Sequence, residues 1–210
     1  MMRRLLAEGL GALLLAAAVI GSGIMAERLA DDNLAVALLA NTGATVATLA
    51  VLIALFGPIS GAHFNPVITL VAVANRSLPI GEAAVYIAVQ VLGCCLGAVL
   101  ANVMFELPVA QFSTHARTGG AQWLSEVVAT AGLVLVAFTS SSIKEAAWRV
   151  PAWIGAAYWF TASTSFANPA ISIGRSLSDT FAGIRPDDVP AFVVAQVLGN
   201  LCTGEGRCSG

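Results

Sequence analysis

Two short apolar stretches that each begin with Asn-Pro limit the possible folds of this chain more than any other feature. They read "NPVITLVAVA" from Asn65 and "NPAISIGRSL" from Asn168. Asparagine is a strong helix N-cap and proline is favoured at the first helical position, so both pairs predict helix starts. Each stretch follows a long apolar run and is about half the ~20 residues that a membrane-spanning helix needs. We therefore expect two half-helices that enter a membrane without crossing it, which is tolerated only inside protein or beside a water-filled cavity.

The rest of the chain has the composition of a membrane protein. Of its 210 residues, 58% are hydrophobic and only 10% are charged, whereas soluble domains carry about 25% charged residues. The apolar runs predict an all-α, multi-pass membrane protein with six transmembrane helices, at residues 5–26, 34–56, 81–105, 121–141, 150–163 and 188–203. The first run has the charged start of a signal peptide. It is long enough to span and Glu8 interrupts it, so it is predicted to be the first helix.

Charges and cysteines argue against several other classes of protein. No basic block suggests binding to nucleic acid. The four cysteines show neither a disulfide framework nor the spacing of metal ligands, and no metal or cofactor is predicted. With the N-terminus in the cytoplasm, six of the ten basic residues fall on the cytoplasmic side of the six spans. The positive-inside rule therefore predicts that both termini are cytoplasmic.

The sequence repeats itself in two halves. "LLAEGLGALLL" around Glu8 is similar to "WLSEVVATAGLVLV" around Glu126, and "AVQVLG" with Gln90 is similar to "VAQVLG" with Gln196. The Asn-Pro stretches lie between these matches, so the order is the same in both halves. Each half holds three spans, and the second half therefore starts from the opposite face of the membrane. This pattern predicts an inverted-topology repeat.

Half-helices from inverted repeats enter from opposite faces and meet near the middle of the membrane. Each N-terminal end carries roughly half a positive charge, and the Asn side chains add amide donors. We expect a cavity with carbonyl groups along its walls and a positive barrier to cations and protons at its centre. Neutral solutes that form hydrogen bonds would pass.

Together these residues resemble the aquaporin and aquaglyceroporin family. The resemblance rests on "SGAHFNPV" and "TSFANPA" with the paired Glu and Gln residues, and it covers residues 5–200. It implies a passive channel, not an enzyme, built from six tilted helices and two half-helices. It also implies a homotetramer in the lipid of the inner (plasma) membrane, with one pore in each subunit. The expected channel domain is residues 1–203, and its two repeat halves are about 1–115 and 116–203. An atypical short tail is expected at residues 204–210.

The resemblance also implies roles for particular residues. The pore motifs are Asn65, Pro66, Val67, Asn168, Pro169 and Ala170. The residues expected to line the pore beside them are His63, Phe64, Thr164 and Phe166. The re-entrant loops are expected to be supported by hydrogen bonds from Glu8, Glu126, Gln90 and Gln196. Two alternatives remain open: the glutamates as proton-relay or catalytic carboxylates, and the histidine as a gate that responds to protonation.

A selectivity filter is implied outside the Asn-Pro pair, at Thr45, Ala156, Ser165 and Ile171. Water-selective members of the family usually have Arg, His and an aromatic residue in this set, and glycerol-conducting members keep the Arg. This chain has none of them, which predicts a wider ring with less positive charge and passage of larger neutral solutes. Arg175, expected to be exposed one helical turn further out, could partly replace the missing charge.

The stretch "NPAISIGRSLSDTFAGIRP" resembles bacterial aquaglyceroporins associated with arsenic-resistance operons. That resemblance implies arsenite-type metalloid acids and glycerol-like polyols as the permeating solutes, with some water. Three other functions remain open. They are an ordinary water channel, a coupled transporter or intramembrane enzyme that uses Glu8 and Glu126, and a junctional protein whose pore is closed. The bulk of Val67 and the short last apolar run, which ends near Cys202, favour the last of these.

Overall fold

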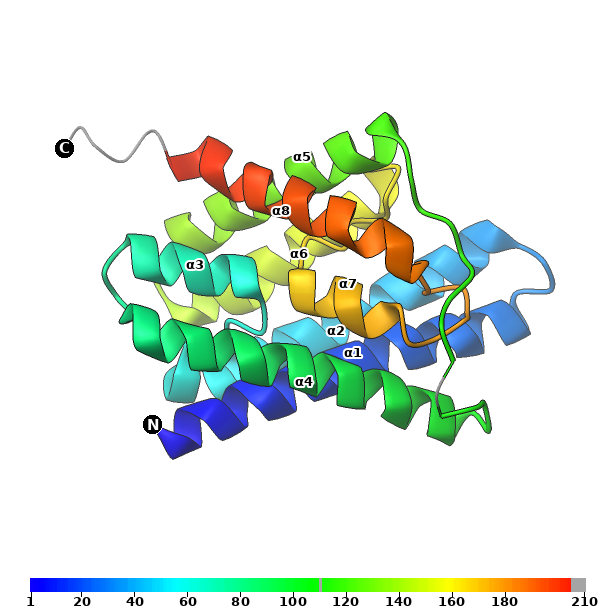
Figure 1. Ribbon diagram of the computed structural model, residues 1–210, viewed down its shortest axis with the longest axis horizontal. Coiled ribbons are helices and arrows are strands. Elements are labelled where there is room, and N and C mark those ends of the chain that lie inside the picture. The colour runs from blue at the N-terminus through cyan, green and yellow to red at the C-terminus, as the bar shows by residue number, and fades with distance from the viewer. Residues whose placement is uncertain (110, 205–210) are drawn as a thin grey trace.

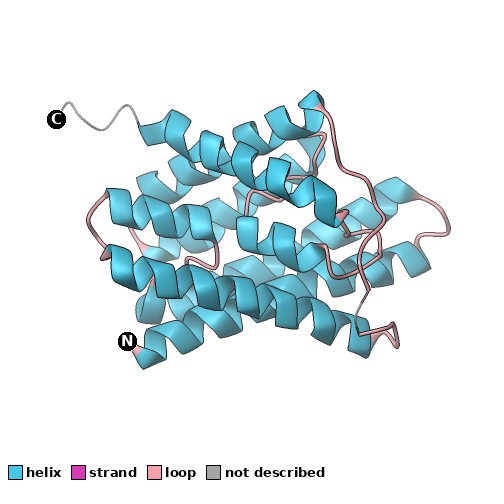
Figure 2. Ribbon diagram, in the orientation of Figure 1, coloured by secondary structure: helices cyan, strands magenta, loops and turns pink. Residues whose placement is uncertain are grey.

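The computed structural model describes residues 1–109 and 111–204, and every regular element within them is helical. Six long helices lie side by side. Two short helices lie among them one after the other, the first towards the left of Figure 1 and the second to its right (Figures 1 and 2). The long helices are α1 (Met2–Leu29), α2 (Leu34–Ser60), α4 (Ile80–Met104), α5 (Gly120–Thr139), α6 (Ile143–Phe160) and α8 (Val189–Gly204). The short ones are α3 (Pro66–Ala74) and α7 (Pro169–Arg175), and a 3-10 turn, η1 (Pro186–Asp188), precedes α8.

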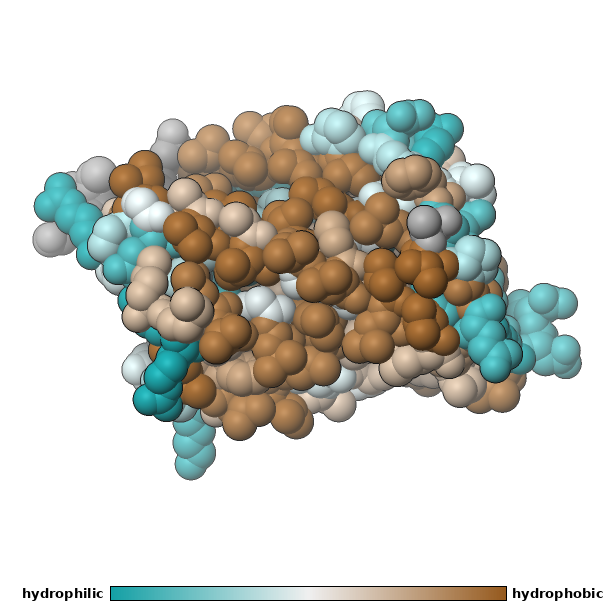
Figure 3. Space-filling view, turned by 60° about the horizontal axis from the view of Figure 1, so that its bottom comes forward, coloured by the Kyte–Doolittle hydropathy of each residue, from teal (hydrophilic) through white to brown (hydrophobic). Residues whose placement is uncertain are grey.

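The outer surface of the bundle suits a membrane. Large apolar side chains such as Leu14, Leu92, Leu135 and Val194 are exposed. On the face drawn in Figure 3, a broad apolar band has hydrophilic residues at its two ends. α1, α2, α4 and α5 are each long and apolar enough to cross a membrane. α1 begins and α8 ends at the same end of the bundle (Figure 1), which we call the inner end; the opposite end is the outer end.

The six long helices agree with the sequence prediction, but the bounds expected for the span at 150–163 were wrong. α6 begins at Ile143 and ends at Phe160. Its first turns are polar, which made them look like a loop. Ser142 caps the helix by accepting a hydrogen bond from the Glu145 amide at 3.2 Å, and the Glu145 carboxylate lies 3.2 Å from Arg149 one turn on. Such caps and i,i+4 pairs stabilise a polar helix start.

The two halves pack in the same way. α4 lies against α1, where a side chain on Gly93 would overlap the carbonyl oxygen of Gly9. α8 lies against α5, where a side chain on Gly199 would overlap the carbonyl oxygen of Val127. Each glycine follows its repeat glutamine by three residues, and small residues of this kind let membrane helices approach closely. The repeat is therefore present in the packing as well as in the sequence. Of the predicted tail, only Gly204 is described; residues 205–210 lie outside the described residues.

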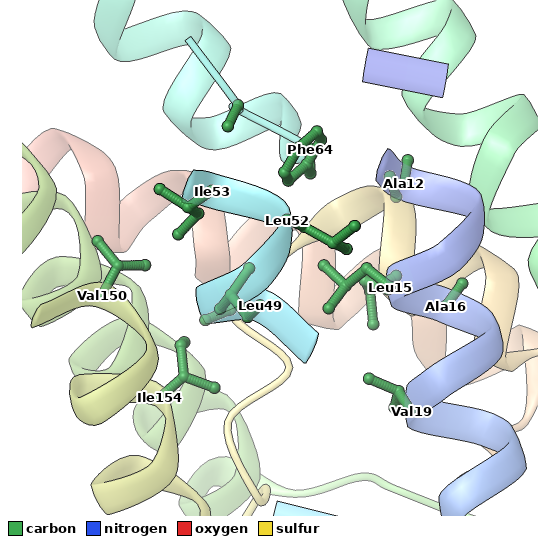
Figure 4. Packing of buried hydrophobic residues seen from close by; sticks show 14 of the residues in the cluster. Ala12, Leu15, Ala16, Val19, Leu49, Leu52, Ile53, Phe64, Val150 and Ile154 are labelled. Carbon is green, nitrogen blue, oxygen red and sulfur yellow. The ribbon is translucent and has the colours of Figure 1, made fainter. Parts of the chain in front are cut away.

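An apolar interior lies between the long helices. Leu15 and Val19 of α1, Leu49 and Ile53 of α2 and Ile154 of α6 converge there (Figure 4). These side chains also form much of the wall of the cavity described next.

Candidate functional site

Both half-helices begin at the predicted asparagines. Asn65 and Asn168 are the N-caps of α3 and α7, and both have extended backbone angles. The Asn65 Oδ1 accepts a hydrogen bond from the Val67 amide at 2.9 Å, and the Asn168 Oδ1 accepts one from the Ala170 amide at 3.0 Å. Pro66 and Pro169 occupy the first helical position, where a missing N–H costs nothing. Local sequence therefore explains why each half-helix starts where it does.

The two asparagines also join the half-helices to each other. The Asn65 Nδ2 donates to the carbonyl oxygen of Ala167 at 2.8 Å, and the Asn168 Nδ2 donates to the carbonyl oxygen of Phe64 at 2.9 Å. The N-termini of α3 and α7 therefore meet head to head. Each amide group has a second hydrogen, and both asparagines border the cavity.

Glu8 holds the first re-entrant loop through its backbone. Its carboxylate is fully buried and accepts hydrogen bonds from the amides of His63 at 3.0 Å and Phe64 at 2.8 Å. It also accepts from the Ser60 hydroxyl at 2.6 Å and from the Gln90 Nε2 at 2.8 Å. Phe64 has a φ of 49°, a conformation that costs about 1–2 kcal/mol for a residue with a side chain. The hydrogen bonds to the carboxylate offset this cost.

Glu126 does the same in the second half. It is fully buried and accepts from the amides of Phe166 at 2.9 Å and Ala167 at 2.8 Å, and from the Gln196 Nε2 at 2.6 Å. Ala167 has a φ of 48°, the counterpart of Phe64 in the first loop. The Gln196 Nε2 is also 2.9 Å from the Ser172 hydroxyl. Neither Glu126 nor Glu8 borders the cavity. Their carboxylates instead hold the re-entrant loops by hydrogen bonds.

A cavity of about 500 Å³ runs beside the junction of the half-helices. At the inner end it is bordered by Gly61 and by the segment from Ser140 to Ile143, and towards the outer end by Tyr158 and Arg175. Most of its wall is apolar. The predicted site residues that border it are His63, Phe64, Asn65, Thr45, Ser165, Phe166, Asn168 and Ile171.

Among the residues predicted for the filter and the pore lining, two do not border the cavity, Ala156 and Thr164; of the pore motifs, Pro66, Val67, Pro169 and Ala170 do not border it either. Ala156 is exposed on the outside of α6. Residues on a helix are spaced by about 100°, so Ile154 and Tyr158 share one face, and that face borders the cavity. Trp153 turns towards α5 and Gly155 towards α2 on either side of it, which leaves Ala156 pointing away. Thr164 is half-buried and does not border the cavity either.

Sequence reasoning overlooked Tyr158 and misjudged Arg175. The Tyr158 hydroxyl lies 3.4 Å from the Thr45 Oγ1, so an aromatic ring stands beside the predicted filter. Arg175 was expected to be exposed, but only 2% of it is accessible. Its Nε donates to the carbonyl oxygen of Ala182, and its guanidinium carbon lies 3.4 Å from the centroid of the Phe166 ring. Tyr158 could have been found from its helical spacing, because it lies one turn after Ile154 on the same face of α6. The burial of Arg175 could not, because it depends on how residues 176–188 fold back.

His63 lies at the inner side of the asparagine pair. Its Nδ1 is 3.1 Å from the Thr69 Oγ1, and its ring lies against Tyr86 with the ring centroids 5.5 Å apart. The Gln90 Nε2 reaches the same Thr69 hydroxyl at 3.0 Å. The histidine ring is therefore held by α3 and α4 and borders the cavity at the same time.

A helical membrane bundle in which two half-helices meet head to head beside a cavity defines a channel of the aquaporin type. A family profile described as "Major intrinsic protein" matches residues 1–164. The chain belongs to the major intrinsic protein family, so it is a multi-pass membrane channel and a passive transporter, not an enzyme.

Known proteins agree with this membership. The chain is 52% identical to "Aquaglyceroporin AqpS" of Rhizobium meliloti (strain 1021) over 202 residues, which is 95% of this chain and 86% of that protein. It is 28% identical to aquaporin-4 of Homo sapiens over 73% of this chain and 46% of that protein, so it spans under half of that relative. The solved structure of the aquaglyceroporin from Plasmodium falciparum has the same fold, with a TM-score of 0.69 over 97% of this chain and 94% of that one, at 17% identity.

Proposed function

We propose that this channel conducts small uncharged solutes of the size of glycerol, including arsenite-type metalloid acids, with some water. The observation that carries the proposal is the filter region itself. By the resemblance to the family, Ile171 takes the position of the arginine, and Ile171, Thr45 and Ser165 all border the cavity.

The wall composition supports the same class of solute. Apolar side chains surround the path, and the amides of Asn65 and Asn168 supply donors at its middle. A neutral solute with several hydroxyl groups fits such a path, because its carbon or arsenic side meets the apolar wall while its hydroxyls reach the donors. The name of the 52% identical relative, an aquaglyceroporin, agrees with this class.

An ordinary water channel is the second candidate. Tyr158 favours it, because its ring stands beside Thr45 where the sequence predicted only the methyl group of Ala156. Pore width decides between the two candidates. The ratio of glycerol to water permeability separates them.

The setting of the channel is also part of the proposal. We infer one channel domain over residues 1–203 with repeat halves 1–115 and 116–203, in the inner (plasma) membrane with both termini cytoplasmic. The exposed apolar band supports contact with lipid. We also infer a homotetramer with one pore per subunit, which rests on membership of the family.

The test is solute uptake by vesicles that contain the protein, with two matched tryptophan variants of α6. Ala146 borders the cavity, so Ala146→Trp should block it and reduce glycerol, arsenite and water uptake to the level of empty vesicles. Ala156 points away from the cavity, so Ala156→Trp should leave uptake at the wild-type level. Arsenite and glycerol uptake by wild type no faster than by empty vesicles would rule out the proposed solutes. Water uptake alone would leave the second candidate.

A further inference from the structure

Arg175 is a buried cation that forms no ion pair within the described residues. Its guanidinium lies on the Phe166 ring and its Nε donates to the carbonyl oxygen of Ala182, which is itself fully buried. Burying a charge without a carboxylate partner is unfavourable unless hydrogen bonds and packing hold it. The surroundings of Arg175 do both, because an aromatic face and a carbonyl oxygen fix the plane of the guanidinium.

A second arginine belongs to the same arrangement. Arg117, in the loop before α5, lies over the Phe166 ring with its guanidinium carbon 5.1 Å from the centroid. Its Nε and Nη2 donate to the carbonyl oxygens of Gly183 at 2.8 Å and Phe181 at 3.3 Å. Burial lowers the pKa of Arg117 to about 10, so it remains charged at neutral pH. Two cations therefore flank one ring, and the segment from Phe181 to Gly183 holds both.

Arg175 also stands at the outer limit of the cavity. It follows Ile171 by four residues in α7, so both side chains are on the same helix face, one turn apart. Both border the cavity, whereas none of the described residues from 176 to 204 does. At the inner end, by contrast, the cavity is bordered by loop residues such as Ser141. The path from the middle of the membrane outwards therefore reaches Arg175 after Ile171.

We propose that Arg175 forms the outer constriction of this pore and supplies the positive charge that excludes cations, one helical turn outside the position where the family carries its arginine. The inference rests on the proposed channel function. A guanidinium in a low-dielectric wall repels cations strongly. Its planar set of donors hydrogen-bonds the hydroxyls of a neutral solute. Ile171 then widens the pore inside this charge without removing the barrier to ions.

The test compares two variants of Arg175 with a matched control in vesicles of equal protein content. Arg175→Leu removes the charge and should raise potassium leak at least about tenfold, because one unit charge a few ångströms away dominates the energy of a cation in the pore. Arg175→Lys keeps the charge and should leave the leak at the wild-type level. It should raise uptake of a polyol larger than glycerol, because lysine lacks the planar group that stacks on Phe166. The control is Arg28→Leu, since Arg28 is an exposed arginine on the outer side that hydrogen-bonds the Phe105 carbonyl and does not border the cavity.

The outcomes separate this inference from the proposed function. A potassium leak of Arg175→Leu equal to that of wild type would overturn the assignment of the charge. If Arg175→Leu does not enter membranes, Arg175→Lys provides the test. Uptake of a polyol larger than glycerol that is unchanged in Arg175→Lys would overturn the assignment of the constriction to Arg175. The double variant Ile171→Arg with Arg175→Leu should restore the low leak and reduce polyol uptake, because the charge moves inward by one turn. If wild-type vesicles take up no neutral solute, the proposed function is refuted. The comparison of potassium leak between wild type and Arg175→Leu would still test whether Arg175 supplies the charge.

Discussion

Replacing Glu126 by glutamine should destabilise the second re-entrant loop strongly. The Oε2 atom of Glu126 accepts hydrogen bonds from the Ala167 amide at 2.8 Å and the Gln196 Nε2 at 2.6 Å. In Glu126→Gln a single carbonyl oxygen remains. If it takes the Oε2 position it keeps these two donors, and the Phe166 amide, which donates to Oε1 at 2.9 Å, then faces an NH2 group. A buried donor without an acceptor costs about 1–3 kcal/mol, so the loss is at least that of one such donor. At about 2–4 °C per kcal/mol for a chain of this size, the Tm should fall by at least about 2 °C.

The assay is thermal unfolding of the detergent-solubilised protein, followed by the fraction that remains monodisperse after heating. Glu145→Gln is the matched control: its side chain is 35% exposed, so water can replace its bonds to Arg149 and to the Ser141 amide and hydroxyl. An exposed pair of this kind is worth at most about 1 kcal/mol. A Glu126→Gln protein whose Tm lies within about 1 °C of wild type would refute the idea that this carboxylate holds the loop. Glycerol uptake by wild type that collapses when an uncoupler is added would instead support a proton-relay role for the glutamates.

Two further predictions follow from the packing and the filter. Gly199→Leu should destabilise the protein by about 1–3 kcal/mol or more, because the added side chain overlaps the Val127 carbonyl. Gly43→Leu, at a position with open space, should stay close to wild type in the same unfolding assay. Ile171→Arg should reduce uptake of arsenite and of large polyols while water uptake persists, since Ile171 borders the outer part of the cavity. Unchanged arsenite uptake in this variant would mean that residue 171 does not set the pore width.

The sequence predicted those parts of the fold that depend on local signals. Asn65 and Asn168 cap their helices through their own side chains, and the apolar runs produce the long helices. The placement of Ala156 in the filter failed because it depends on how α6 is rotated in the bundle. That rotation is set by contacts with its neighbours: Trp153 hydrogen-bonds the carbonyl oxygen of Ala129, and Gly155 lies against α2. Counting from a motif carries no information about such contacts.

Arg175 was misjudged for a similar reason. An arginine near the end of a short helix, followed by a polar stretch, normally reaches solvent. Here the chain from residue 176 onwards folds back, and the carbonyl oxygen of Ala182 covers the guanidinium. Burial of this kind depends on tertiary packing of a loop, for which sequence patterns are weakest. The polar start of α6 was missed because a polar loop and a polar, capped helix start have similar compositions. Only the hydrogen bond from the Glu145 amide to Ser142 and the pairing of Glu145 with Arg149 distinguish the two.

The crossed hydrogen bonds of the two asparagines have a consequence for biosynthesis. The acceptor of the Asn65 amide is 102 residues further along the chain, and the Asn168 amide reaches back 104 residues to its acceptor. While the ribosome is still making the second half, the first loop therefore holds a polar amide at membrane depth without its final partner. The completed first half must wait in this state, shielded by water or by the insertion machinery, until Ala167 arrives. Closure of the centre is thus one of the last steps of assembly, and a chain interrupted before residue 167 would leave the Asn65 amide without its final acceptor.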